Sequence, residues 1–386
     1  MGNILSSYIF LIANESNELL GLTSAITGLA MTMTVLPAGY FSDRFPRDRI
    51  LRGASIVGFI GLVCALLATD IIMIFVALLF WGLFQGMNRP SLEAIFADSV
   101  ESGNRSRIYA WNHLSRQIAM ASGPFVNIIL FLFLGDVWEI QILKIVMISG
   151  LLISMSSLAV MNLFDDKKSL GKASEHLDIV PTSEFNSNDD NNMFRGSLLI
   201  TIILLISNLI IGFGAGMTIK FFPIFFMKQY NLTPIPVQLI MGTTSIITGF
   251  TSIFAQRSSL KRGRAEMIFI VQGIATVCLF VISFYPPIII LVPIFLARGS
   301  LMNASQPLSR SILMDVVPKR NRGKVNSLQA LAWGMFWNFS AAIGGFLIGP
   351  SNNFRSCFIV TTSLYVIGTL LILVIIPFVA KEKHAT

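Results

Sequence analysis

The chain alternates along its whole length between long apolar runs and short charged segments. Eleven of these runs are long enough to cross a bilayer as a helix, which takes roughly 20 residues. Their charged residues lie at the ends. The runs cover residues 20–41, 51–69, 71–97, 108–134, 139–163, 197–222, 237–256, 266–284, 288–314, 325–348 and 356–380. This pattern predicts an all-α polytopic membrane protein.

One further apolar segment, residues 4–13, is too short to span a bilayer as a helix. We interpret it as the end of a first helix that is truncated in this sequence, which gives eleven full spans and a partial one. A cleaved signal peptide is the alternative, but the segment lacks a basic leading region and a small-residue cleavage site.

Composition supports a membrane protein and excludes several function classes. The 386 residues are 54% hydrophobic and 12% charged, which one soluble core cannot accommodate. The three cysteines are scattered within apolar runs, so they indicate neither a metal site nor a disulfide framework. The phosphate-binding motif G-x-x-x-x-G-K-[ST] does not occur. We therefore expect no cofactor, no metal and no enzymatic activity.

Basic residues are concentrated in alternate loops, and this asymmetry predicts the orientation in the membrane. Most of the 28 Lys and Arg residues fall in the loops near residues 44–52, 105–107, 167–195, 257–264 and 319–324 and in the tail after 380. The positive-inside rule places these loops and the C-terminus in the cytoplasm. The net charge of +8 is then a topology signal, and nucleic-acid binding is not needed to explain it. We expect a monomer in the lipid bilayer, and the sequence does not indicate which membrane.

The chain contains an internal repeat with an offset of 217 residues. The offset superimposes Gly82 on Gly299, Pro90 on Pro307, Asp98 on Asp315, Arg105 on Arg322, and Arg47 on Arg264. We therefore predict an N-terminal helical half at 1–163, a C-terminal half at 196–380 and a cytoplasmic tail at 381–386. Residues 164–195 are rich in Asn, Ser, Asp and Glu without a helical period, and we predict a flexible linker there.

A short charged segment between the first two full runs carries the most specific motif. It reads Gly39, three residues, Asp43-Arg44, then a basic cluster that includes Arg47. The segment resembles the cytoplasmic signature between the second and third helices of major facilitator superfamily transporters. It departs from that signature at Pro46, where the family has glycine, and at Asp48, where the family has a second basic residue.

The resemblance implies a fold of two six-helix halves and a latch on the inner side. Asp43 would accept hydrogen bonds from the start of a helix near Asn326, where the helix dipole favours an anion. Arg47 would pair with Asp98, and Lys261 or Arg264 with Asp315. The alternative is that these charges only anchor loops and set topology. The candidate gate residues are Gly39, Asp43, Arg44, Arg47, Asp98, Arg105, Lys261, Arg264, Asp315 and Arg322.

Two further patterns bear on the branch of the superfamily. Drug–proton antiporters carry a glycine-rich fifth helix, and Gly123-Pro124 with small residues at Ala110 and Ala119 are similar to it. These small residues allow close helix packing. The final two glycines of that pattern are replaced here by Asn127 and Ile128. Many proton-coupled members carry an arginine where this chain has Gly82, which argues against proton coupling.

Ionisable and polar residues within the runs are candidates for a substrate or coupling site, because charges at bilayer depth are costly. Arg89 and Glu93 lie one turn apart around Pro90, and Arg310 is the repeat partner of Glu93. These three residues either titrate in a cavity or form a structural ion cluster, and we favour the cluster. The full candidate set is Asn88, Arg89, Glu93, Asn127, Asn208, Lys220, Gln306, Arg310, Trp333, Trp337 and Asn338.

These observations predict a secondary transporter of a small organic solute, working by alternating access and favouring proton-coupled efflux. A facilitator or importer of a polar metabolite, such as a sugar or an organic anion, is the alternative within transport. A third hypothesis is a transporter-like sensor or scaffold that does not transport. Gly123-Pro124 favours the first hypothesis and Gly82 opposes it, while the short first helix keeps the third open.

Overall fold

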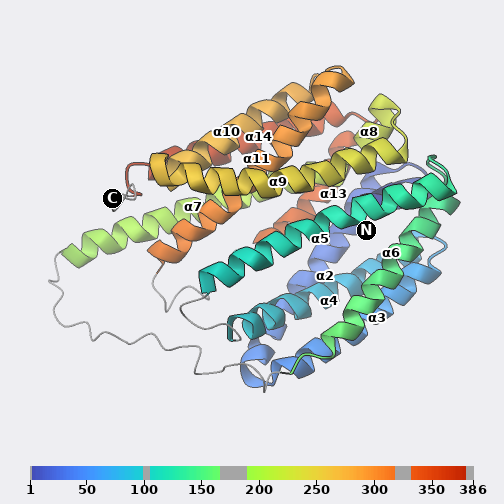
Figure 1. Cartoon of the computed structure of the whole chain (residues 1–386), viewed down its shortest axis with the longest axis horizontal. Helices are drawn as coiled ribbons and strands as arrows, with labels where there is room; N and C mark the ends of the chain where they lie inside the picture. The colour runs from blue at the N-terminus through green and yellow to red at the C-terminus, as the bar shows by residue number, and fades with distance from the viewer. Residues whose placement is uncertain (1, 99–104, 166–188, 318–331, 380–386) are drawn as a thin grey trace.

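The computed structural model describes residues 2–98, 105–165, 189–317 and 332–379, and the secondary structure in these ranges is helical (Figure 1). Within them, 10 helices are long and apolar enough to span a membrane. The expected all-α polytopic fold is therefore confirmed. The predicted run 325–348 lies partly outside the described residues, and its described part contains the shorter apolar helix Gly334–Ile348.

The helices of the two halves follow one another in chain order. The first half contains α1 (Gly2–Ile12), α2 (Asn17–Arg44), α3 (Arg47–Leu67), α4 (Ile71–Asp98), α5 (Arg105–Leu134) and α6 (Ile140–Met161). The second half contains α7 (Asp189–Ile219), α8 (Phe222–Tyr230), α9 (Pro234–Arg262), α10 (Arg264–Ile282), α11 (Ile288–Val316), the π-helical turn η4 (Ala332–Phe336), α13 (Trp337–Ile348) and α14 (Phe354–Ile375).

Several helices extend beyond the apolar run that predicted them. At the start of α2, Ser16 Oγ accepts a hydrogen bond of 3.2 Å from the backbone N–H of Leu19, so the helix begins at a polar cap ahead of the first apolar residue. The helix α7 begins at Asp189, within the stretch that composition assigned to the linker. Hydropathy reports the part of a helix that lies in lipid, whereas capping groups set where it begins.

The run predicted at 197–222 agrees with the apolar span Leu198–Ile219 of α7. After Lys220 and Phe221 the chain continues as the separate helix α8 to Tyr230. Pro223 accounts for the interruption, because it has no N–H to donate to the carbonyl one turn earlier. Lys220 therefore lies between α7 and α8.

The backbone repeats with the offset found in the sequence. Helices α2, α3 and α4 begin at residues 17, 47 and 71, and α9, α10 and α11 begin 217 residues later at 234, 264 and 288. Asn14 after α1 and Asn231 after α8 share a left-handed conformation, with φ of 52° and 51°. The short helix α1 thus occupies the position in the first half that α8 occupies in the second.

Two helix pairs join the halves. The helix α2 packs between α4 of its own half and α13 of the other, and α5 packs against α9. Both pairs can be followed in Figure 1, where α5 and α9 lie close together near the α8 end of the molecule and diverge toward the end with the C-terminus. Within the second half, an aromatic cluster joins α8 to α11 and α14. The Phe222 ring lies 5.3 Å from that of Phe358 and 4.8 Å from that of Phe295.

Glycines allow α13 to approach its neighbours at backbone distance. A Cβ added at Gly216 of α7 would overlap the carbonyl oxygen of Trp337, and one at Gly344 would overlap that of Met217. In contrast, a Cβ at Gly212, one turn from Gly216 on α7, would have no atom within 4 Å. Only some of the glycines are therefore required for packing.

This contrast predicts the effect of two matched substitutions. Gly216→Ala should lower the free energy of unfolding by about 1–3 kcal/mol through overpacking. Gly212→Ala should be neutral or stabilise the protein by up to about 1 kcal/mol, because alanine favours a helix. Thermal unfolding of the purified variants in detergent compares them, and equal midpoints for the two would contradict the packing described.

Candidate functional site

The α2–α13 contact is a close helix crossing between the two halves. A Cβ at Gly28 would overlap the side chain of Asn338, and one at Gly345 would overlap the carbonyl oxygen of Asn17. Asn338, predicted as a cavity residue, therefore lies in this crossing, and its Nδ2 donates to the Gly334 carbonyl at 2.7 Å. The crossing brings polar backbone and side-chain groups of the two halves within hydrogen-bond distance.

Polar contacts between the halves gather at one end of the bundle, which we call the Asn17 end. The buried Asn17 donates through Nδ2 to the Gly349 carbonyl at 2.9 Å and to Asn352 Oδ1 at 2.8 Å. Lys228 Nζ lies 2.5 Å from Glu15 Oε1 in an ion pair.

Contacts of the α5–α6 loop complete the closure of this end. Trp138 Nε1 donates to the Leu232 carbonyl at 2.7 Å, and Asp136 Oδ1 accepts from the backbone N–H of Ile235 at 2.8 Å. The second bond also satisfies a free N–H in the first turn of α9. Donors and acceptors from both halves thus hold the Asn17 end closed.

The helices α5 and α9 separate toward the end of the bundle opposite to the Asn17 end. On α5 and α9 the contacts include Asn127 Nδ2 to Gln238 Oε1 at 3.2 Å, and Pro124 against Gly242. Further along α9, two turns after Gly242, an added Cβ at Gly249 would have no atom within 4 Å. The halves therefore meet at the Asn17 end and lose contact along α5 and α9 as the helices approach the other end (Figure 1).

A polar stripe runs along α11 within this arrangement. Asn303, Gln306 and Arg310 are all exposed and follow one another at helical spacing. Gln306 Nε2 donates to Asn303 Oδ1 at 3.3 Å, and Asn303 Nδ2 donates to the Gly299 carbonyl at 2.8 Å. A polar face on a membrane-spanning helix is typical of a helix that lines a water-filled cavity.

The corresponding stretch of α4 also carries polar residues. Asn88 is partly buried, and its Oδ1 has no hydrogen-bond partner. Arg89 is exposed, and Pro90 lies inside the helix. The side chain of Glu93 is outside the described set, so the cluster expected from Arg89, Glu93 and Arg310 stays a prediction.

The remaining cavity candidates are scattered over the second half. Asn208 and Lys220 are partly exposed, on α7 and just after it. Trp337 is the first residue of α13, and its carbonyl meets Gly216. Trp333 lies in the π-helical turn η4, and its side chain is outside the described set. The regular α-helical spacing expected for the two tryptophans is therefore interrupted.

The buried Arg298 of α11 is a residue to which sequence reasoning gave no role. It is 4% exposed. Its Nη2 donates to Tyr365 Oη at 3.0 Å and to Thr218 Oγ1 at 3.5 Å. Its guanidinium lies 4.8 Å from the centroid of the Phe222 ring. The signal in the sequence was an arginine ten residues into the apolar run 288–314, in the stretch before the polar residues Asn303, Gln306 and Arg310.

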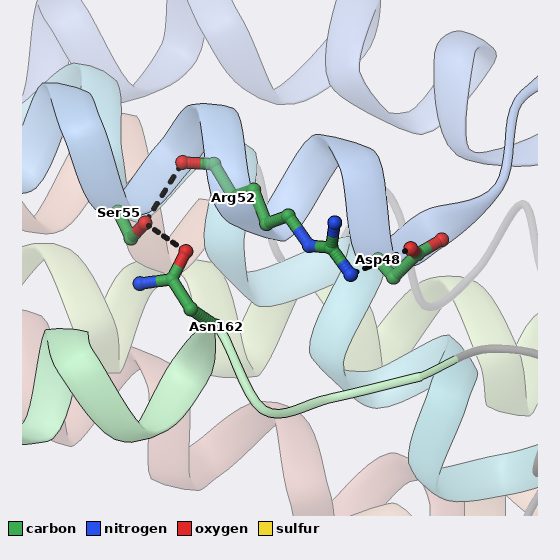
Figure 2. A network of polar contacts seen from close by, with 4 residues as sticks. All are labelled: Asp48, Arg52, Ser55 and Asn162. Atoms are coloured by element: carbon green, nitrogen blue, oxygen red, sulfur yellow. Dashed lines mark hydrogen bonds and ion pairs between the residues drawn. The ribbon is translucent and has the colours of Figure 1, made fainter.

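The predicted signature lies mostly on helix ends rather than in a loop. Gly39, Asp43 and Arg44 belong to the last turns of α2, and Arg47 begins α3 after only two non-helical residues. Figure 2 shows the first turns of α3 with the end of α6. Asp48 forms a 3.4 Å ion pair with Arg52, so the acid that departs from the family pattern neutralises a neighbouring base.

A serine links this segment to the end of α6. Ser55 Oγ lies 2.8 Å from the Arg52 carbonyl and 3.2 Å from Asn162 Oδ1 (Figure 2). The contact fixes α3 against α6 in the same half.

Most of the ion pairs expected for the inner latch involve side chains that the structure does not describe, so these pairs stay predictions. The side chains of Asp43, Arg44, Asp98, Arg105 and Asp315 are outside the described set, as are Arg322 and Asn326 entirely. In the second half, Lys261 is exposed, and Arg264 Nη1 lies 3.3 Å from Ser311 Oγ.

Among the small residues of α5, Pro124 makes a contact with the other half. Ala119 is exposed and a Cβ at Gly123 would meet open space, so neither packs closely in this structure. The side chain of Ala110 is outside the described set.

Comparisons with known proteins agree with this architecture. A D-xylose–proton symporter matches with a TM-score of 0.72 at 16% identity, over 99% of this chain and 93% of the symporter. A bacterial homologue of the iron transporter ferroportin in its inward-facing state matches with 0.71 at 12% identity, over 96% and 93% of the two chains. The same kind of homologue in its outward-facing state matches with 0.58 at 11% identity, over 96% of each chain. Identities this low show the fold alone.

Sequence comparison adds a relative and a family. A Na(+), Li(+), K(+)/H(+) antiporter from Planococcus maritimus is 30% identical over 128 residues, which are 32% of this chain and only 30% of the antiporter. The profile of the Major Facilitator Superfamily matches residues 1–207 and again residues 204–386. Because the match covers both halves, the chain belongs to the Major Facilitator Superfamily of transporters.

Proposed function

We propose that the chain is a secondary transporter that moves a small organic solute by alternating access, with proton-coupled efflux as the favoured direction. The observation that carries this proposal is the unequal contact between the halves. They are held by hydrogen bonds and an ion pair at the Asn17 end, whereas α5 and α9 diverge toward the other end and Gly249, two turns beyond the contact at Gly242, faces open space (Figure 1). Two halves that separate at one end and close at the other are the two sides of an alternating-access cycle.

Orientation follows from the charges of the loops. The basic residues at the end opposite to the Asn17 end include Arg49, Arg257, Lys261 and Arg262, all exposed. By the positive-inside rule that end faces the cytoplasm. The structure then represents an inward-open state, which agrees with its higher similarity to the inward-facing ferroportin homologue than to the outward-facing one.

A similar protein supports proton coupling, and one residue of this chain argues against it. The antiporter from Planococcus maritimus exchanges protons, and it aligns with 128 residues of this chain. In contrast, Gly82 occupies the position at which many coupled members have an arginine. Efflux rests on the similarity of the Gly123-Pro124 segment to that of drug–proton antiporters.

Transport itself is tested in proteoliposomes that enclose a pH-sensitive dye. We expect a panel of amphipathic solutes to include one that moves protons on addition. Gln306→Leu should lower the transport rate about fivefold, as expected for the loss of one hydrogen bond worth about 1 kcal/mol. Gln229→Leu, at an exposed position of α8, is the matched control and should leave the rate unchanged.

The other outcomes of this experiment identify the alternatives. Solute movement without proton movement would replace the coupled antiporter with a facilitator or importer. The absence of movement for every solute would favour a sensor or scaffold that does not transport.

Closure of the Asn17 end is tested with spin labels on cysteines at positions 14 and 351, in a background without the native cysteines. Asn17→Ala removes two bonds across the halves and leaves buried acceptors unpaired, which costs the closed end about 1–3 kcal/mol. We expect the distance distribution between the labels to shift to longer distances. Glu139→Gln, an exposed residue of the α5–α6 loop, should leave the distribution unchanged. Identical distributions for Asn17→Ala and the parent protein would show that Asn17 does not hold this end closed.

A further inference from the structure

Among the residues that the structure describes, no acidic side chain pairs with the buried guanidinium of Arg298. The side-chain contacts that the structure describes for it are two hydroxyl groups and the faces of two aromatic rings. These contacts orient the guanidinium but carry no negative charge. Arginine cannot neutralise itself by losing its proton at physiological pH. A buried, unpaired ion costs several kcal/mol, so the charge calls for an anion.

The second half cannot supply that anion. Between residues 191 and 380 the only acidic residues are Glu266 and Asp315. Asp315 lies 17 residues after Arg298 on the same helix, which places the two about 25 Å apart along the helix axis. Glu266 lies in the first turn of α10, at the end of the second half that carries the basic residues Lys261, Arg262 and Arg264. Motion of the halves against each other leaves these distances within the second half unchanged.

Arg298 lies near the middle of the bilayer. It is the eleventh residue of α11, so it is about 15 Å from the start of a helix that crosses a core about 30 Å thick. It contacts Thr218 and Phe222, which lie on either side of the interruption between α7 and α8. Transporters of this architecture bind their substrates at this depth, often beside an interrupted helix.

Two hydrogen-bonding groups at this point lack a partner among the described residues. Arg298 Nε is buried and has no partner there. Tyr365 Oη accepts from Arg298, and its own O–H has no acceptor among the described residues. Lys220 lies in the interruption, two residues after Thr218, and its side chain is more exposed than that of Arg298.

We propose that Arg298 and Tyr365 bind a carboxylate or a similar monovalent oxyanion at mid-depth, and that the transported solute is an organic anion. The assignment of the solute rests on the proposed transport function, whereas the anion site itself does not.

Anion binding is measured as a rise in the thermal unfolding midpoint of the purified chain in detergent. Benzoate is compared with neutral benzamide, which has the same shape without the charge, and with nitrate. We expect benzoate to raise the midpoint and benzamide to have no effect. Arg298→Gln should weaken benzoate binding at least about 30-fold, and Tyr365→Phe about fivefold, as expected for one charged and one neutral hydrogen-bonding group. Arg262→Gln, an exposed arginine at the end of α9, is the control and should bind as the parent does.

The unfolding midpoints of the unliganded parent and of Arg298→Gln distinguish anion binding from a purely structural role of Arg298. A structural arginine predicts that Arg298→Gln unfolds at a lower temperature. Our proposal predicts a midpoint equal to or above that of the parent, because the variant removes an uncompensated charge. Arg298→Lys keeps the charge and should retain part of the response to benzoate. A lower midpoint together with an unchanged response in Arg298→Gln would overturn the proposal, as would a parent protein that does not respond to any anion.

The following outcomes identify the source of the anion and distinguish the proposed anion site from the proposed transport function. Nitrate protection equal to that of benzoate, without uptake of benzoate into proteoliposomes, would assign the site to a free inorganic anion and overturn the assignment of the solute. Uptake of neutral solutes that is unaffected by Arg298→Gln would preserve transport and exclude Arg298 from substrate binding. Benzoate binding without transport of any solute would preserve the site and exclude the proposed function.

Discussion

The absence of water in the bilayer is the constraint on which the rest of this structure depends. Every backbone N–H and C=O in the hydrocarbon must find a partner within the protein, so each span is a helix. Serine and threonine hydroxyls follow the same rule. Thr27, Thr248 and Ser252 each donate to a carbonyl one turn earlier in their own helix. Among the described residues, buried polar atoms without a hydrogen-bond partner include Asn17 Oδ1, where the halves meet, and Arg298 Nε, at the proposed anion site.

Helix packing without a hydrophobic driving force explains where those positions lie. Glycines at the α2–α13 and α7–α13 crossings bring backbones close enough for van der Waals contact. The resulting arrangement connects α13 to both halves at once. The hydrogen bonds of Asn17 to the α13–α14 loop follow from this position, because the start of α2 lies against Gly345. The close α2–α13 packing and the hydrogen bonds of Asn17 that close this end are therefore parts of one contact.

The fold could be predicted from the sequence because the length of a lipid-crossing helix and the repeat are both linear properties of the chain. The 217-residue offset between Gly82 and Gly299 recurs in the starts of α2 and α9. The helix α8 was not predicted as a separate element, because its nine residues are too few for a span and follow α7 after only Lys220 and Phe221. The site could be predicted less well. Hydropathy gave the depth of Arg298 but not the side of α11 on which it lies, and only the neighbouring Thr218 and Tyr365 show that it has no acid beside it.

The uncompensated charge of Arg298 also has an electrical consequence. At the equivalent position of the first half, 217 residues earlier, the chain has Trp81, so the charge belongs to one half alone. If the proposed alternating access moves Arg298 through part of the transmembrane field, the unliganded protein carries this positive charge with it, and a full crossing would be worth about 2.3 kcal/mol per 100 mV. With an anion bound as proposed, the same motion carries no net charge at this position. The two proposals together then predict that membrane voltage acts on the return of the unliganded protein more than on the loaded step.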